Sequence, residues 1–151
     1  MNLSIKPDLS GKIAVITGGA GVLCREFAKA LALCGAKVAI LNRTLSKAEA
    51  VAAEIAAMGG TAIAVGVDVT KKDSVEAAHE AVLAQLGPCD ILINGAGGNN
   101  PRATTDNEYC TFKKQVDKDF FDLDAGGVRF VFELNFIGSS LPTQVFCKGM
   151  V

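Results

Sequence analysis

The stretch TGGAGVLC at residues 17–24 decides how this sequence is read. It ends the apolar run 12–17 and opens an amphipathic stretch, so we predict a tight turn between a buried strand and a helix. Gly19, Gly21 and Cys24 occupy the three positions of the pattern G-x-G-x-x-G, with cysteine in the third. The first two positions serve the turn and the approach of backbone to a pyrophosphate, and the third serves helix–strand packing. The stretch therefore predicts a dinucleotide-binding loop, with a plain strand-to-helix turn as the alternative.

Short apolar runs alternate with longer amphipathic ones as far as Asn94. The pattern predicts strands at 12–17, 37–42, 61–69 and 89–94, with helices between them at 22–36, 45–60 and 71–88. Strands separated by helices of this length pair in parallel through right-handed crossovers. The predicted fold class is α/β, a Rossmann-type doubly wound parallel sheet with strand order 3-2-1-4. In the first helix, Leu23, Phe27, Leu31 and Cys34 recur at helical spacing and are expected to form its apolar face, with Gly35 ending the helix.

The alternation stops after Asn94. Residues 95–127 are polar, charged and rich in glycine, and a connection of this length is typical of a functional or mobile segment. The sequence then turns apolar, which predicts a long helix over 128–151 with an irregularity at Pro142. We find no pattern for a fifth strand. The length fits one dinucleotide-binding domain over 1–151.

Composition argues against several classes of function. The formal net charge is −1, whereas nucleic acids and anionic membranes are bound by basic patches, so neither is an expected partner. Five cysteines without C-x-x-C spacing are typical of reduced thiols in a reducing compartment. The single histidine, His79, has no neighbours at metal-ligand spacing, so no metal site is expected. Without a secretory signal or a long apolar run, the expected location is the cytoplasm.

The end of the predicted second strand bears on the choice of cofactor. An acidic residue about twenty positions after the glycine loop would bind the ribose hydroxyls of NAD, and a nearby arginine would accommodate the 2′-phosphate of NADP. Asn42 stands in place of the acidic residue, and Arg43 follows it. The lost negative charge and the added cation lean toward NADP, although Asn42 can still hydrogen-bond a ribose hydroxyl. A solvated loop cation is the alternative interpretation of Arg43.

Four motifs in order carry a resemblance that covers nearly the whole chain. They are LSGKIAVITGGAG near the start, Asp68-Val69 after the third strand, DILINGAGG at the fourth, and ELNFIGSSLPTQVF later. In this combination the chain resembles the short-chain dehydrogenase/reductase family, as its N-terminal portion. Within the family it is similar to the sugar-acid subgroup of D-mannonate oxidoreductases and fructuronate reductases, which share the GVL loop and an NGAGGNNP-like run.

The resemblance implies roles for the matching positions. The positions that would surround the pyrophosphate are Gly18, Gly19, Gly21 and Leu23. Those that would run past the nicotinamide ribose are Asn94, Gly95 and Ala96. Asp68 would accept a hydrogen bond from the adenine amino group, with Val69 beside the ring. Asn135 would help to order a water in a catalytic proton relay. The family further implies NAD or NADP as cofactor, a small-molecule substrate and a homotetramer.

The chain also departs from the family pattern. In the ungapped register of T-G-x-x-x-G-x-G, Val22 and Cys24 replace the last two glycines, and Gly95 replaces the second asparagine of N-N-A-G. The family's serine, tyrosine and lysine, which handle the hydroxyl proton, follow the asparagine helix. Only sixteen residues follow Asn135 in this chain of 151. We therefore expect this chain alone to be inactive or nearly so.

The single tyrosine forms a Y-x-x-x-K spacing with a lysine, Tyr109 and Lys113. This pair precedes Asn135 and falls in the long polar segment, which is the wrong place for the family's catalytic pair. We expect a surface or substrate-covering segment there instead.

Two hypotheses of function follow. The first is the cofactor-binding part of an NAD(P)-dependent oxidoreductase that acts on a carbonyl or secondary alcohol, with a sugar acid as the expected substrate. The second is a non-catalytic dinucleotide-binding or interaction module, because the fourth strand would form an open sheet edge that invites a partner strand.

Overall fold

Four parallel strands form one sheet in the order β3-β2-β1-β4. The computed structural model describes residues 6–106 and 118–151. The strands are β1 (Ile13–Thr17), β2 (Lys37–Asn42), β3 (Thr61–Gly66) and β4 (Ile91–Asn94). The predicted fold class and strand order are confirmed, although β3 ends earlier and β4 begins later than expected.

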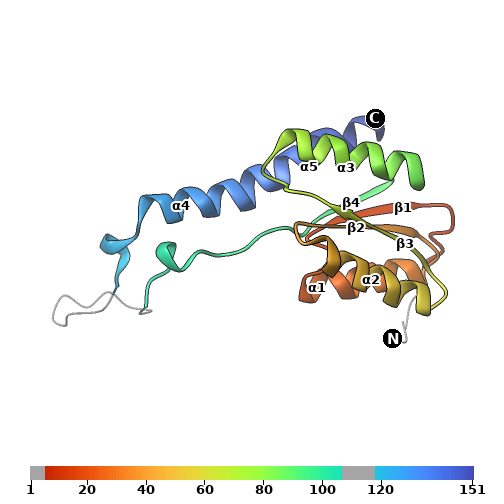
Figure 1. Ribbon diagram of the computed structural model, residues 1–151, viewed down its shortest axis with the longest axis horizontal. Helices are drawn as coiled ribbons and strands as arrows, with labels where there is room; N and C mark the ends of the chain where they lie inside the picture. Colours follow the sequence, from red (N-terminus) through yellow and green to blue (C-terminus); the bar gives the residue numbers. More distant parts are fainter. Residues whose placement is uncertain (1–5, 107–117) are drawn as a thin grey trace.

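Helices cover both faces of the sheet (Figure 1). One face carries α1 (Val22–Leu33) and α2 (Leu45–Ala57), and the other carries α3 (Lys72–Gln85) and α5 (Gly138–Phe146). Because successive strand residues point to opposite faces, Ile16 packs with α1 and α2 while Val15 packs with α3 and α5. Among the described residues, Phe146 is the largest fully buried side chain, and it fixes the end of α5 against the sheet.

The predicted apolar face of α1 is wrong for Leu23 and Phe27, whereas Leu31 packs against the core and Cys34 is buried, as expected. Leu23 is 71% exposed and Phe27 is 50% exposed. The residues that face the sheet are Cys24, Ala28 and Ala32. Small side chains let a helix lie close to the strands, and this close packing overrides the larger side chains at helical spacing.

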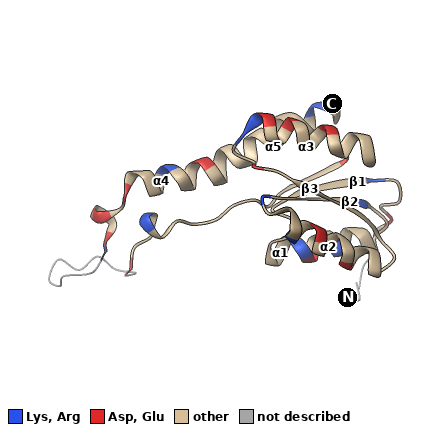
Figure 2. Ribbon diagram, in the orientation of Figure 1, with Lys and Arg blue, Asp and Glu red and all other residues tan. Residues whose placement is uncertain are grey.

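Beyond Asn94 the chain leaves the body and forms an extended arm (Figure 1). The described elements of the arm are the 3-10 turns Pro101–Ala103 and Phe120–Asp122, the helix α4 (Ala125–Phe132) and the π-helical turn Glu133–Ile137. Arg102 links the outgoing and the returning segment of the arm. The Arg102 Nη1 lies 3.1 Å from the Asp124 Oδ1, and the Asp124 N–H donates to the Arg102 carbonyl. Lys and Arg positions are interspersed with Asp and Glu positions on both the arm and the body (Figure 2).

The C-terminal helical run differs from the prediction. It begins at Ala125, because the Asp124 carboxylate caps the Gly127 N–H at 2.7 Å. The irregularity is the π-helical turn at Glu133–Ile137, one turn before Pro142, and the α-helix ends at Phe146. Within residues 6–106 and 118–151, the structure contains no helix both long and apolar enough to cross a bilayer. The pair Tyr109 and Lys113 lies outside the described residues.

Candidate functional site

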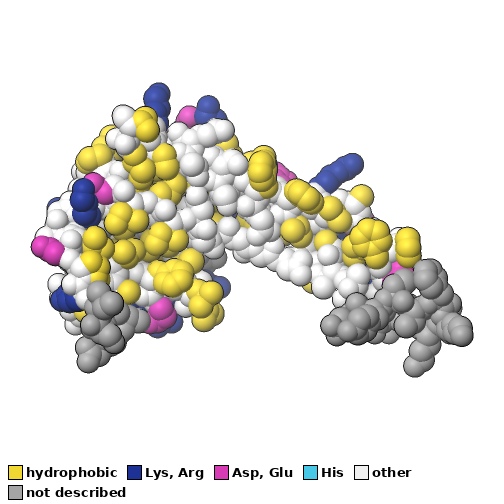
Figure 3. Space-filling model, turned by 180° about the vertical axis from the view of Figure 1, so that it is seen from behind, with side chains coloured by type: hydrophobic (Ala, Val, Ile, Leu, Met, Phe, Trp, Pro, Cys, Tyr) yellow, Lys and Arg dark blue, Asp and Glu magenta, His cyan; other side chains and the backbone are white. Residues whose placement is uncertain are grey.

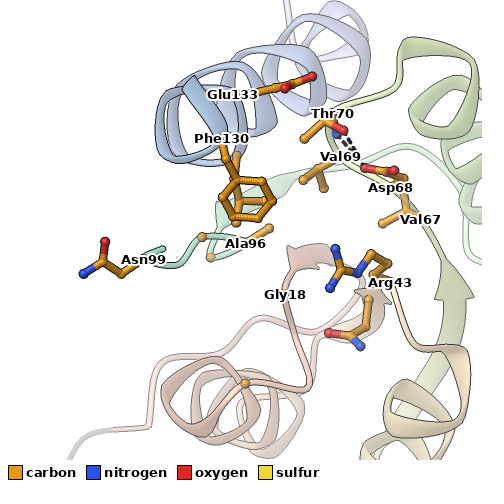
Figure 4. A pocket seen from close by; sticks show the side chains of 15 residues that line it. Gly18, Arg43, Val67, Asp68, Val69, Thr70, Ala96, Asn99, Phe130 and Glu133 are labelled. Carbon is orange, nitrogen blue, oxygen red and sulfur yellow. Dashed lines mark hydrogen bonds between the residues drawn. The ribbon is translucent and has the colours of Figure 1, made fainter. Parts of the chain in front are cut away.

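A cavity of about 560 Å³ opens at the carboxyl-terminal edge of the sheet (Figure 4). Segments that follow all four strands line it, together with one side of the helical run from the arm. In sheets of this kind, ligands bind at this edge near the point where the strand order reverses. The volume lies within the usual range of small-molecule sites.

The glycine loop between β1 and α1 forms one wall of this cavity. Gly18 has a φ of +62°, and a Cβ at this position would lie 2.7 Å from the Gly95 carbonyl oxygen. A Cβ at Gly19 would lie 3.0 Å from the Ile40 Cγ2, so this residue packs inside the turn. Gly21 is the N-cap of α1 and carries no side chain to cover the helix end. The first helical N–H groups therefore remain available for an anion, which the positive end of the helix dipole also favours.

Thr17 joins this loop to the end of β4. The Thr17 side chain is fully buried, and its Oγ1 accepts hydrogen bonds from the N–H groups of Gly95 at 3.1 Å and Ala96 at 3.2 Å. The Gly95 N–H also lies 3.2 Å from the Thr17 carbonyl oxygen. Thr17 belongs to the predicted loop, but its link to the end of β4 was not predicted, although a hydroxyl at the end of an apolar strand was a signal for it.

Asn42 and Arg43 lie where β2 ends at the cavity. The Asn42 Nδ2 donates to the Thr44 carbonyl at 3.0 Å, which leaves the Oδ1 as the acceptor of this amide. The Arg43 side chain extends into the cavity (Figure 4). This pair can therefore accept a hydrogen bond from a hydroxyl and attract an anionic group.

Asp68 and Val69 follow β3. The Asp68 Oδ1 accepts hydrogen bonds from the Thr70 Oγ1 at 2.7 Å and the Thr70 N–H at 3.1 Å. The Thr70 hydroxyl is the main cause of a lowered pKa at Asp68, with the Thr70 N–H and the charges of Lys71 and Arg43 acting in the same direction. The carboxylate is therefore ionised at neutral pH and acts as an acceptor. A Cβ at Gly138 would lie 2.8 Å from the Val69 Cγ2, so the helical run passes directly over Val69.

The arm contributes a wall of the cavity that was not predicted from the sequence. Phe130, Glu133 and Leu134 line the cavity, and the Phe130 ring lies near Ala96, across the opening from the loop after β3 (Figure 4). The i, i+4 spacing of Phe130 and Leu134, next to Asn135, was the signal in the sequence. An aromatic ring and an aliphatic side chain on one wall, facing the Asp68 carboxylate on the other, can accommodate a flat base with an amino edge.

Eight of the predicted cofactor residues meet at this cavity: Gly18, Gly21, Asn42, Arg43, Asp68, Val69, Gly95 and Ala96. Gly19, Leu23 and Asn94 are not part of its lining. Gly19 supports the turn, whereas the exposed Leu23 side chain makes no part of this wall. The Asn94 Nδ2 instead donates to the Thr143 Oγ1 at 2.9 Å and ties β4 to α5.

Asn135 joins the arm's helix to the segment after β4. Its Nδ2 donates to the carbonyls of Gly98 and Val131, each at 2.8 Å, and its Oδ1 accepts from the Gly98 N–H at 3.1 Å. The backbone carbonyl of Asn135 accepts from the Ser139 hydroxyl at 2.9 Å. The side chain thus holds the helix and the strand extension in register, and its catalytic role stays a prediction.

Comparison with known proteins agrees with this geometry. The family model described as short chain dehydrogenase matches residues 12–151. The chain is 51% identical over 150 residues to an uncharacterized oxidoreductase, UxuB, of Bacillus subtilis, covering 99% of this chain and 53% of that protein. An uncharacterized oxidoreductase of Haemophilus influenzae is 46% identical over 152 residues, covering 100% of this chain and 53% of that protein.

Solved structures lead to the same family. A candidate D-mannonate oxidoreductase from Haemophilus influenza, solved with bound NAD, superposes with a TM-score of 0.92 at 46% identity, covering 96% of this chain and 52% of that one. A metagenomic short-chain oxidoreductase in complex with NADP gives a TM-score of 0.78 at 27% identity, covering 94% and 57% of the two chains.

The chain therefore belongs to the short-chain dehydrogenase family, and the resemblance carried by the four sequence motifs is confirmed. It spans about half the length of the curated relatives it matches. The family match favours an oxidoreductase over a non-catalytic module.

The contacts of Asn135 generate a prediction about local stability. Asn135→Ala removes the acceptor of the Gly98 N–H and two donors, so the segment after β4 opens more readily. We expect amide exchange at Gly98 to accelerate by about tenfold or more, which corresponds to about 1–3 kcal/mol of local stability. Ser139→Ala removes only a bond within the helix and serves as the control. Equal Gly98 exchange in Asn135→Ala and wild type would contradict the assignment.

Proposed function

We propose that this chain is the NAD(P)-binding part of an oxidoreductase that transfers hydride between nicotinamide and a carbonyl or secondary alcohol. One observation carries the proposal. The N-terminus of α1, capped only by Gly21, opens onto a cavity whose opposite walls are formed by the Asp68 carboxylate and the Phe130 ring. An anion site next to a slot for a flat base is the combination that a dinucleotide requires.

Each wall of the cavity has a proposed task. The first N–H groups of α1 bind the pyrophosphate, Asn42 and Arg43 bind the adenosine ribose, and Asp68 accepts from the adenine amino group. Gly95 and Ala96 guide the nicotinamide ribose. The nicotinamide ring itself supplies the hydride chemistry when the cofactor is bound. The charge of Arg43, without an acidic residue at position 42, leads us to propose a modest preference for NADP.

A sugar acid such as mannonate or fructuronate is the proposed substrate class. Its support is the likeness to the candidate D-mannonate oxidoreductase that binds NAD. We propose that these 151 residues alone bind the cofactor without turning over such a substrate, because the single tyrosine precedes Asn135 instead of following it. A cytoplasmic location is proposed as well, supported by four free cysteines among the described residues: Cys24, Cys34, Cys89 and Cys147.

Self-association into a homo-oligomer, a tetramer by family resemblance, is the proposed state of assembly. The supporting observation is an apolar strip on the arm, where Phe132 is 67% exposed and Phe136 is 66% exposed. Hydrophobic side chains along the arm are visible in Figure 3. Exposed apolar surface of this kind marks a contact site.

Dinucleotide binding is tested directly by titrating the chain with NADPH and NADH and following nucleotide fluorescence. Gly18→Ala should weaken binding by at least about tenfold. Alanine is strained at the positive φ of this position, and its Cβ would overlap the Gly95 backbone. Gly59→Ala is the matched control, since Gly59 has a φ of +80° but open space around it. Absence of binding by wild type, or equal losses in both variants, would refute the proposal.

Cofactor choice is tested at the end of β2. Asn42→Asp places a carboxylate where a 2′-phosphate is expected, so the ratio of the NADPH to the NADH dissociation constant should rise by about tenfold. Asn99→Asp adds the same charge to another part of the cavity lining and should leave this ratio within about twofold. An unchanged ratio in Asn42→Asp would overturn the assignment of the ribose site.

Assembly is tested by sedimentation velocity. Wild type should sediment as an oligomer, and the double change Phe132→Ser with Phe136→Ser should shift it toward the monomer by removing apolar contact area. A matched control is Leu83→Ser, an exposed apolar residue on α3. A monomeric wild type, or an oligomer unaffected by the double change, would contradict the proposed contact strip.

A further inference from the structure

Cys24 and Gly95 lie in contact where the glycine loop meets the end of β4. Cys24 belongs to the first turn of α1, and Gly95 directly follows β4. A Cβ built on Gly95 would overlap the Cys24 Sγ and would lie 3.6 Å from the Cys24 Cβ. The thiol therefore occupies the space that a side chain at position 95 would need.

The backbone of Gly95 is held on its other sides too. Its N–H bonds to the Thr17 Oγ1 and lies near the Thr17 carbonyl oxygen. A Cβ at Gly18 would lie 2.7 Å from the Gly95 carbonyl oxygen, so the glycine loop is packed against the same residue. Gly95 is exposed toward the cavity, and these backbone atoms and the buried Thr17 hydroxyl oppose its movement in the other directions.

Cys24 is equally confined. It is buried, and it packs with Ile16 and Ala28 in the core beneath α1. Burial raises the pKa of the Cys24 thiol, so the group is uncharged at neutral pH and acts through its volume. A larger side chain here would press on Gly95, and a smaller one would leave a gap beside it.

We propose that Cys24 and Gly95 form a steric pair that sets the position of the segment after β4 relative to the glycine loop, an inference that rests on the dinucleotide function proposed above. Cys24 is thus a positioning residue: its thiol limits where Gly95 and Ala96 run past the nicotinamide ribose. The chain departs from the family pattern at both positions, with cysteine for glycine at 24 and glycine for asparagine at 95. The missing side chain at 95 makes room for the added thiol at 24, so the two departures compensate for each other.

A double-mutant cycle without ligand tests the pair. Gly95→Ala should lower the Tm by about 5 °C or more in wild type, but by less than about half as much in the Cys24→Ala background. A remainder persists in both backgrounds, because the new Cβ would also lie 2.9 Å from the Thr17 carbonyl oxygen, a backbone atom that must then shift. Gly66→Ala is the control, because its Cβ would meet only the Leu45 Cβ at 3.9 Å. It should shift the Tm equally in both backgrounds.

A second readout separates positioning from folding. Gly95→Ala should weaken NADH binding by about tenfold, and the double variant should return to within about threefold of Cys24→Ala. Binding of 5′-AMP, which probes only the adenosine end, should change by less than about twofold in every folded variant. If Gly95→Ala alone does not fold, the proposal requires that the double variant Cys24→Ala with Gly95→Ala folds and binds NADH.

Either of two results would overturn the proposal: equal Tm losses from Gly95→Ala in both backgrounds, or no loss in wild type. Parallel losses of NADH and 5′-AMP affinity would show that the pair maintains the fold without positioning the nicotinamide end. Failure of wild type to bind either nucleotide would instead refute the proposed function, and the Tm cycle would still decide whether the steric pair exists.

Discussion

The buried hydroxyl of Thr17 holds two strands together at the point where the whole site is assembled. It accepts hydrogen bonds from the N–H groups of both Gly95 and Ala96, which follow β4. Buried donors without partners are expensive, so this junction resists separation. Gly18 packs against Gly95 from the neighbouring loop, and its positive φ directs the chain into α1. The glycine loop and the β4 extension therefore behave as one rigid wall.

The opposite wall depends on the arm that begins at this junction. The chain after β4 runs outward, and the helical run returns over Val69 to the sheet. Asn135 ties the returning helix to Gly98 through both atoms of its side-chain amide. In this register Phe130 and Leu134 line the cavity. Rigid elements on both sides of a cavity are what a bound cofactor needs for its reactive ring to be aligned.

The sequence predicted the sheet and much of the site, because both follow local rules. Buried β-branched runs such as 12–17 identify central strands, and residues at strand ends such as Asp68 must meet at one edge. The first half of the α1 face was predicted wrongly, since Cys24 and Ala28 are small enough for close packing whereas Leu23 is not needed in the core. The place of Phe130 at the cavity was not predicted, because it depends on the contact between Asn135 and Gly98, which lie 37 positions apart in the sequence.

The most direct test of this account is an NMR titration of the ¹⁵N-labelled chain with NAD. If the loop and the β4 extension form one wall of a dinucleotide site, the amide signals of Gly18, Gly21, Gly95 and Ala96 shift together, with the same dissociation constant, and Asp68 shifts with them. Shifts confined to the arm or to the outer face of α1, or a loop that responds while Gly95 and Ala96 do not, would contradict it.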